Sequence, residues 1–232
     1  MNSLYYGFGS LTEILLLVVG TIVVIFAQFK VKGAYSKYVG VKCNKGLAGC
    51  EVARKVLDNA GLGKVHVVEV KGELTDHYDP KQKVVRLSTE IFHGTSIASV
   101  AVAAHECGHA IQDKDNYTFM IIRASLVPVV NFVNKFGYIA TIIGLIAGIF
   151  DVIILGIVML LATMLFQVVT LPVEFDASKR AKKIISELNL ATDTEQEGVE
   201  KMLSAAAFTY VASVINTLFQ LLRLLVRLND RD

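Results

Sequence analysis

The sequence predicts a mainly α-helical membrane protein that also contains an α+β region with a small β-sheet. Hydrophobic residues make up 53% of the 232 residues, which is more than a soluble domain of this size usually contains. Apolar runs long enough to cross a bilayer recur at 14–29, 130–149 and 152–173, whereas residues 31–118 are rich in charge and contain short β-branched pieces. We therefore expect at least three transmembrane helices attached to a water-exposed core.

The segment 1–30 is predicted to be an N-terminal transmembrane anchor. Its uncharged run at 14–29, extended by Leu11 and Thr12, is long enough for roughly 30 Å of hydrocarbon at about 1.5 Å per residue. No small-residue cleavage pattern follows it, so we expect an uncleaved anchor. Only Glu13 precedes the run, whereas five lysines follow it: Lys30, Lys32, Lys37, Lys42 and Lys45. The positive-inside rule then places residue 30 onward in the cytoplasm.

The cytoplasmic segment 31–118 is predicted to hold one helix, two strands and a second helix. The first helix fits residues 47–59 and stops at Gly61 and Gly63. The strands fit 65–70 and 83–87, and the sequence HYDPKQ between them is typical of a turn. The second helix fits 95–112, with Ser96 or Thr95 as N-cap.

Residues 119–173 are predicted to form a transmembrane hairpin with crossings at 130–149 and 152–173 and a tight turn at Asp151. A second basic cluster follows at 179–183, so residues 174–232 should lie on the same side as residue 30. This last segment is predicted to be helical. Its apolar stretch 202–222 is followed by Arg223, Arg227 and Arg231. We therefore favour a helix packed on the core or lying at the interface over a fourth crossing.

Residues 105–109 read His-Glu-Cys-Gly-His, which is the pattern of a catalytic zinc site. On a helix, His105 and His109 project from one face a single turn apart, so both imidazoles can bind one ion. Glu106 is turned by about 100° around the axis and is predicted to act as the general base on a zinc-activated water. Burying these groups in an apolar helix without partners would be costly, and a metal site removes that cost.

A catalytic zinc site needs a third protein ligand, and Glu174 is the leading candidate. The motif helix precedes the membrane hairpin and Glu174 follows it, so the hairpin returns Glu174 to the same membrane face. Asp176 is the rival ligand, although we favour it as a hydrogen-bond acceptor that supports a ligand imidazole. The alternative to a role at the metal, for both residues, is that of a solvated carboxylate near a helix N-terminus.

Other polar residues give weaker signals. His77 is a candidate for contacting substrate or stabilising an oxyanion, but a turn histidine is more often exposed and without function. Tyr210 is a candidate hydrogen-bond donor to the transition state. A structural role, in which its hydroxyl is bonded to a backbone carbonyl, explains a phenol in an apolar helix at least as well. Cys107 reads as a packing residue, and Gly108 as a site of close backbone approach. The three cysteines fit no disulfide framework, which favours a reducing compartment.

HECGH, with LTDHYDP before it and LPVEFDASKRA after it, resembles the YugP-like family of bacterial neutral zinc metallopeptidases across nearly the whole chain. It is similar, more distantly, to membrane zincins of the prenyl-protease and heat-shock-protease types. The resemblance implies a zincin-like core in which His105, His109 and Glu174 bind zinc and Glu106 is catalytic. Ser178 stands where the distant relatives have an Asp, so either Asp176 or Ser178 is expected to support the ligands.

The predicted function is that of a multi-pass cell-membrane zinc metallopeptidase, with one Zn²⁺ per chain and its site on the cytoplasmic face. Its expected partners are the lipid bilayer and a peptide or protein substrate, including membrane-associated ones. A net charge of only +2 gives no field that would indicate nucleic acid as a partner. The alternative is a non-catalytic membrane scaffold or chaperone-like protein stabilised by zinc, although such a protein has no need of Glu106. The sequence does not predict the oligomeric state.

Overall fold

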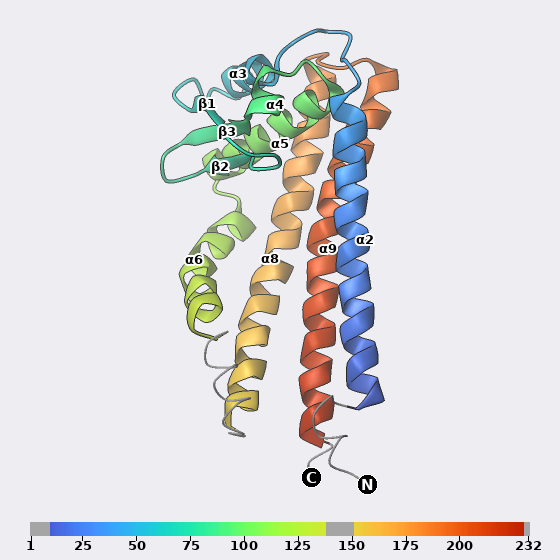
Figure 1. The fold of residues 1–232 in the computed structure, drawn as a ribbon. Helices are drawn as coiled ribbons and strands as arrows, with labels where there is room; N and C mark the ends of the chain where they lie inside the picture. Colours follow the sequence, from blue (N-terminus) through green and yellow to red (C-terminus); the bar gives the residue numbers. More distant parts are fainter. Residues whose placement is uncertain (1–9, 138–150, 230–232) are drawn as a thin grey trace. The chain divides into compact units, whose positions relative to one another are not determined.

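The computed structural model describes residues 10–137 and 151–229, which fall into two compact units. One, here called the helical unit, takes in Met1–Gln28, Ile122–Leu171 and Thr209–Asp232. The other, here called the core unit, takes in Phe29–Ile121 and Pro172–Phe208. Three long helices each contribute residues to both units (Figure 1): α2 (Leu11–Val39), α8 (Asp151–Glu187) and α9 (Asp193–Asn229).

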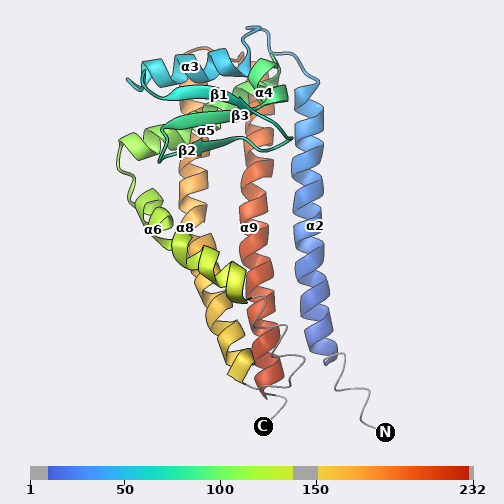
Figure 2. The same ribbon diagram turned by 60° about the vertical axis from the view of Figure 1, so that its left-hand side comes forward.

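The core unit contains a three-stranded sheet with the strand order β1-β3-β2. Strand β1 (His66–Val70) runs parallel to β3 (Val84–Ser88), and β2 (His77–Asp79) runs antiparallel to β3. Helices α3 (Gly49–Asn59) and α5 (Ile97–Lys114) pack together and against the sheet (Figure 2), and α4 (Thr89–His93) joins β3 to α5. Their contact buries apolar side chains completely, among them Val56, Leu57, Val85 and Leu87.

The helices and strands predicted for this region at 47–59, 65–70, 83–87 and 95–112 are confirmed within one to two residues at each end. The prediction of a turn across HYDPKQ is wrong for residues 77–79, which form β2. Tyr78 is buried there, and its hydroxyl donates to Asp113 Oδ2 at 2.6 Å. The turn begins only after Asp79, whose Oδ1 accepts hydrogen bonds from the N–H groups of Lys81 and Gln82.

Within the described residues, four helices are long and apolar enough to cross a membrane: Leu11–Val39, Thr118–Gly137, Ile154–Glu187 and Asp193–Arg227. The second of these combines α6 (Thr118–Phe132) with a π-helical turn, η1 (Val133–Gly137), so it begins well before the crossing predicted at 130–149. Residues 138–149 of that prediction lie outside the described part. The stretch 202–222, for which we favoured a packed or interfacial helix, belongs to α9 and is itself among the four.

Candidate active site

Helix α5 contains the HECGH motif, and the local sequence explains why this helix forms. Ser96 is the N-cap, because its Oγ accepts a hydrogen bond from the N–H of Ser99 at 3.1 Å. Small residues line its buried faces, so neighbouring elements approach closely. The closest approach is at Gly108, where a Cβ atom would lie 2.7 Å from the Ala177 carbonyl oxygen on α8. Gly108 therefore permits a close backbone approach, as the sequence predicts.

The structure brings His105, His109 and Glu174 together, although Glu174 lies on a different helix. Their ligand atoms all lie within 4.8 Å of one another. Glu174 Oε2 is 3.3 Å from His105 Nε2 and 3.6 Å from His109 Nε2. Glu174 stands inside the continuous helix α8 and is only 2% exposed. The alternative reading, a solvated carboxylate at a helix N-terminus, is therefore wrong for Glu174.

These three residues fit a zinc ion. Two imidazoles and one carboxylate are a donor set of catalytic zinc sites, which keep the fourth position open. Tetrahedral bonds of about 2.1 Å place neighbouring ligand atoms about 3.4 Å apart, and the two N···O separations at Glu174 lie close to that value. The imidazole rings are nearly perpendicular, at 83°, with centroids 4.8 Å apart. Among the described residues, this is the one His/Cys/Asp/Glu cluster compact enough to hold a metal.

Glu106 is buried beside these ligands, with 8% of its surface exposed. Burial raises the pKa of Glu106 above its ordinary value, because a carboxylate loses hydration there. His105 and His109 oppose this rise, and the charge of Glu174 adds to it. Glu106 is thus close enough to all three ligands to respond to their charges.

Each ligand imidazole has a hydrogen-bond partner at its other ring nitrogen. Ser178 Oγ lies 3.2 Å from His105 Nδ1, and Gln112 Oε1 lies 3.0 Å from His109 Nδ1. Asp176 instead accepts a hydrogen bond from the Gln112 amide nitrogen at 2.9 Å. Of the two residues expected to support the histidines, Ser178 thus contacts an imidazole directly, whereas Asp176 contacts Gln112, which in turn contacts an imidazole.

Gln112 is the site residue that sequence reasoning missed. It is fully buried, and it follows His109 by three residues on α5, so both lie on one helix face. The sequence does indicate a role for Gln112, because its amide continues the polar face of the motif about one turn beyond His109. This signal is weak, because Gln112 ends the predicted helix and the charged residues that follow it are typical of a solvated terminus.

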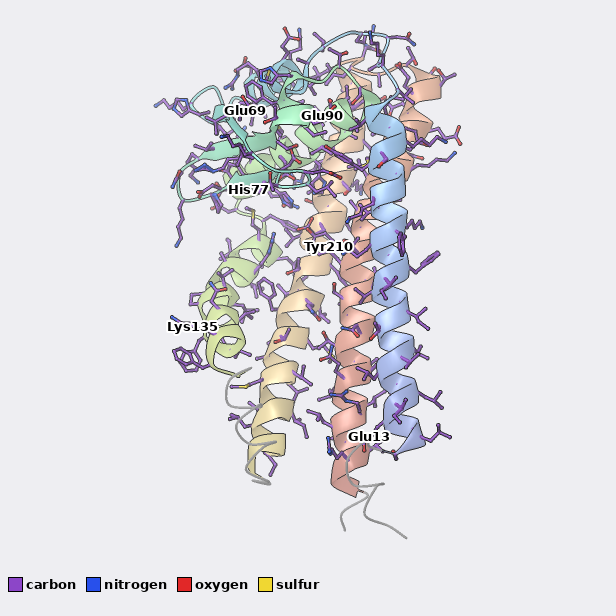
Figure 3. The ribbon with its side chains drawn as sticks, in the orientation of Figure 1. Glu13, Glu69, His77, Glu90, Lys135 and Tyr210 are labelled. Atoms are coloured by element: carbon purple, nitrogen blue, oxygen red, sulfur yellow. The ribbon has the colours of Figure 1, made fainter. Side chains whose placement is uncertain are left out.

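His77 and Tyr210, which are labelled in Figure 3, are not members of the cluster formed by His105, His109 and Glu174. His77 is an exposed residue of β2, and its Nδ1 is 2.8 Å from the Thr75 carbonyl oxygen. Tyr210 lies on α9 in the helical unit. Cys107 is buried, with its thiol 3.5 Å from the Ala53 carbonyl oxygen. Packing therefore explains Cys107, whereas roles for His77 and Tyr210 stay predictions.

Comparison with known proteins agrees with this geometry. Residues 13–229 match the family described as "Putative neutral zinc metallopeptidase". A protein from Bacillus subtilis (strain 168) named "Putative membrane protease YugP" is 46% identical over 208 residues, which cover 89% of this chain and 92% of that relative. No solved structure matches the chain significantly.

Proposed function

The chain belongs to the zinc peptidase family described as "Putative neutral zinc metallopeptidase", and from this premise we propose that it is a membrane-bound metalloendopeptidase. The observation that carries the proposal is the convergence of His105, His109 and Glu174 from two helices, with Glu106 buried beside them. A relative named as a membrane protease and four apolar helices support the membrane location. We place the site on the cytoplasmic face, because lysines follow the apolar run of α2.

In the proposed reaction, His105, His109 and Glu174 hold one zinc ion and leave one position open. Zinc bound there would polarise the scissile carbonyl and lower the pKa of the attacking water towards about 7. Glu106 accepts the proton that this water loses and delivers it to the nitrogen of the leaving amine. With a Zn²⁺ ion bound, two neutral imidazoles and one carboxylate would leave a net positive charge on the metal and its three residues, which would stabilise the negative charge that develops on the carbonyl oxygen.

The test is to compare the wild type with Glu106→Gln for bound metal and for cleavage of casein or a fluorogenic peptide. We expect about one zinc per chain in both proteins, because Glu106 is not a ligand. Cleavage by the variant should fall by about 10²–10⁴-fold, since an amide cannot accept the proton. Metal content is measured by mass spectrometry of the purified protein in detergent.

Glu187→Gln is the matched control, because Glu187 is an exposed glutamate of α8 that pairs only weakly with Lys183 at the surface. It should retain both zinc and cleavage. If the wild type binds zinc and neither it nor the control cleaves any substrate, the scaffold alternative gains over the peptidase. A wild-type protein that binds no zinc would contradict both the peptidase and the zinc-stabilised scaffold.

A further inference from the structure

A polar chain of residues stands behind His109 in the core unit. It starts at the fully buried Gln112, whose Oε1 faces His109 Nδ1 at 3.0 Å. The Gln112 amide nitrogen is 2.7 Å from the Val173 carbonyl oxygen and 2.9 Å from Asp176 Oδ2. Gln112 therefore joins the motif helix α5 to the segment of α8 that contains Glu174.

These contacts determine which way the Gln112 amide points. The Val173 carbonyl accepts hydrogen bonds and cannot donate, and the same holds for an ionised Asp176 carboxylate. The NH₂ group of Gln112 must therefore face these two oxygens, which turns Oε1 towards His109. Because Oε1 can only accept, the proton of a neutral His109 ring must sit on Nδ1. Its lone pair is then on Nε2, which is the nitrogen that lies beside Glu174.

Arg180 fixes the outer end of this chain. Its Nε donates to Asp176 Oδ2 at 2.6 Å, and its Nη1 donates to Asp115, the residue that ends α5. Arg180 thus holds the Asp176 carboxylate in place beside Gln112, and it links the end of α5 to α8 by charge-assisted hydrogen bonds.

We infer that Gln112 is a positioning residue that sets the tautomer of His109 so that Nε2 is presented to the metal, with Asp176 and Arg180 holding Gln112 in that orientation. The inference rests on the proposed zinc site and adds to it a residue that determines how tightly the ion is held. Partners in this position typically change metal affinity by about 10–100-fold when they are removed.

The test measures the zinc dissociation constant by chelator competition for the wild type and Gln112→Met, which has a similar shape but cannot accept the Nδ1–H bond. We expect about 10–100-fold weaker zinc binding. The matched control is Gln82→Met, because Gln82 is exposed and its side chain accepts a hydrogen bond from Arg86, which is not part of this polar chain. It should bind zinc like the wild type. Nitrogen chemical shifts of the metal-free proteins should show a larger share of the Nδ1–H form of His109 in the wild type than in Gln112→Met, where Glu174, beside Nε2, is the acceptor that remains for a ring proton.

A second variant distinguishes positioning from packing. Gln112→Glu keeps the shape of the side chain and an acceptor for His109, but it sets a carboxylate against Asp176 Oδ2 and the Val173 carbonyl oxygen, so zinc binding should weaken although the packing is retained. This variant also serves if Gln112→Met fails to fold. Wild-type zinc affinity in either variant overturns the inference, while zinc in the wild type leaves the proposed function standing. A wild type that binds no zinc overturns both.

Discussion

Asp76 is a partly buried carboxylate directly before β2, and it accepts hydrogen bonds from Ser88. Its Oδ1 accepts the Ser88 N–H at 2.7 Å and the Ser88 hydroxyl at 3.0 Å. Burial raises the pKa of Asp76, and the hydrogen bonds from Ser88 oppose that rise without cancelling it. The ionised form is therefore less favourable in the folded protein than in the unfolded chain.

The sign of this shift predicts how Asp76→Asn changes stability with pH. Because the folded-state pKa is raised, the contribution of Asp76 to stability is fully present below the unfolded value of about 3.9 and is lost as the pH rises through the folded value. Asn resembles the protonated form and keeps an acceptor for Ser88. We expect the Tm of Asp76→Asn, relative to the metal-free wild type, to be higher at about pH 7.5 than at about pH 4.5. An equal difference at both pH values would contradict this.

The three clustered residues, which we propose as zinc ligands, could be singled out from the sequence because each follows from a simple pattern. The spacing of His105 and His109 fixes one helix face, and Glu174 follows from a hairpin that returns the chain to its starting side. Their supporting residues could not be ranked in advance. Whether Asp176 or Ser178 reaches an imidazole depends on the rotation of α8 against α5, which no local pattern of charge or hydropathy specifies.

At the scale of elements, the site depends on how closely α5 and α8 approach each other. Gly108 has no side chain to separate them, and a Cβ atom there would lie 2.7 Å from the Ala177 carbonyl oxygen and 3.2 Å from its Cα. Both of these atoms are backbone, so they cannot move aside as a flexible side chain can. Glu174 precedes Ala177 by about one turn on α8, and a displaced α8 would move it away from the histidines.

We therefore expect Gly108→Ala to destabilise the core unit by about 1–3 kcal/mol through overpacking. Zinc binding should weaken in the same variant, because the third ligand shifts with α8. The control is Gly33→Ala on α2, where a Cβ would meet nothing within 4 Å; alanine should there be neutral or stabilising by up to about 1 kcal/mol. Chelator competition and denaturant unfolding measure the two effects. Equal behaviour of the two variants would contradict the close-contact argument.

The elements that sequence reasoning missed owe their form to tertiary contacts. Strand β2 forms because Tyr78 is buried and pairs with Val85, which outweighs the turn-forming residues around it. Helix α2 continues to Val39, beyond the apolar run, because Val31, Tyr35 and Tyr38 are buried in the core unit at helical spacing. Hydropathy alone ends this helix at its first lysine.

At the scale of the whole molecule, composition and the lengths of the uncharged runs predict a mainly helical protein and the apolar helices found at Leu11–Val39 and Ile154–Glu187. The crossing predicted at 130–149 overlaps the described helix Thr118–Gly137 only over 130–137. Under the positive-inside rule, the arginines that follow the apolar stretch of α9 argue against a crossing, because a crossing would place them on the outer side. That rule describes a bias summed over the loops of a chain. The rule takes no account of the contacts of an individual helix, and those contacts decide whether α9 crosses the membrane or lies at its surface.

Within the helical unit, a contact between α2 and α9 favours a crossing for both. Gly20 stands in the middle of the apolar run of α2, and a Cβ there would lie 2.8 Å from Asn216 Oδ1 and 3.3 Å from the Phe219 ring. Asn216 and Phe219 in turn lie within the apolar stretch of α9. A helix lying flat at the interface cannot reach the middle of a crossing helix at about half of a 30 Å hydrocarbon layer. If α2 spans the bilayer, α9 must enter it as well.

We therefore predict that Asn189 and Asn229, which lie at opposite ends of the α9 segment, are on opposite sides of the membrane. Fusion of alkaline phosphatase after Asn229 should give an active, exported enzyme, and fusion after Asn189 an inactive, cytoplasmic one. Green fluorescent protein at the same positions should give the reverse pattern, because it fluoresces only where it folds in the cytoplasm. Fluorescence from both fusions would place α9 at the inner surface. The close contact of Gly20 with Asn216 would then exclude a simple crossing for α2, and with it the anchor that precedes the catalytic helix.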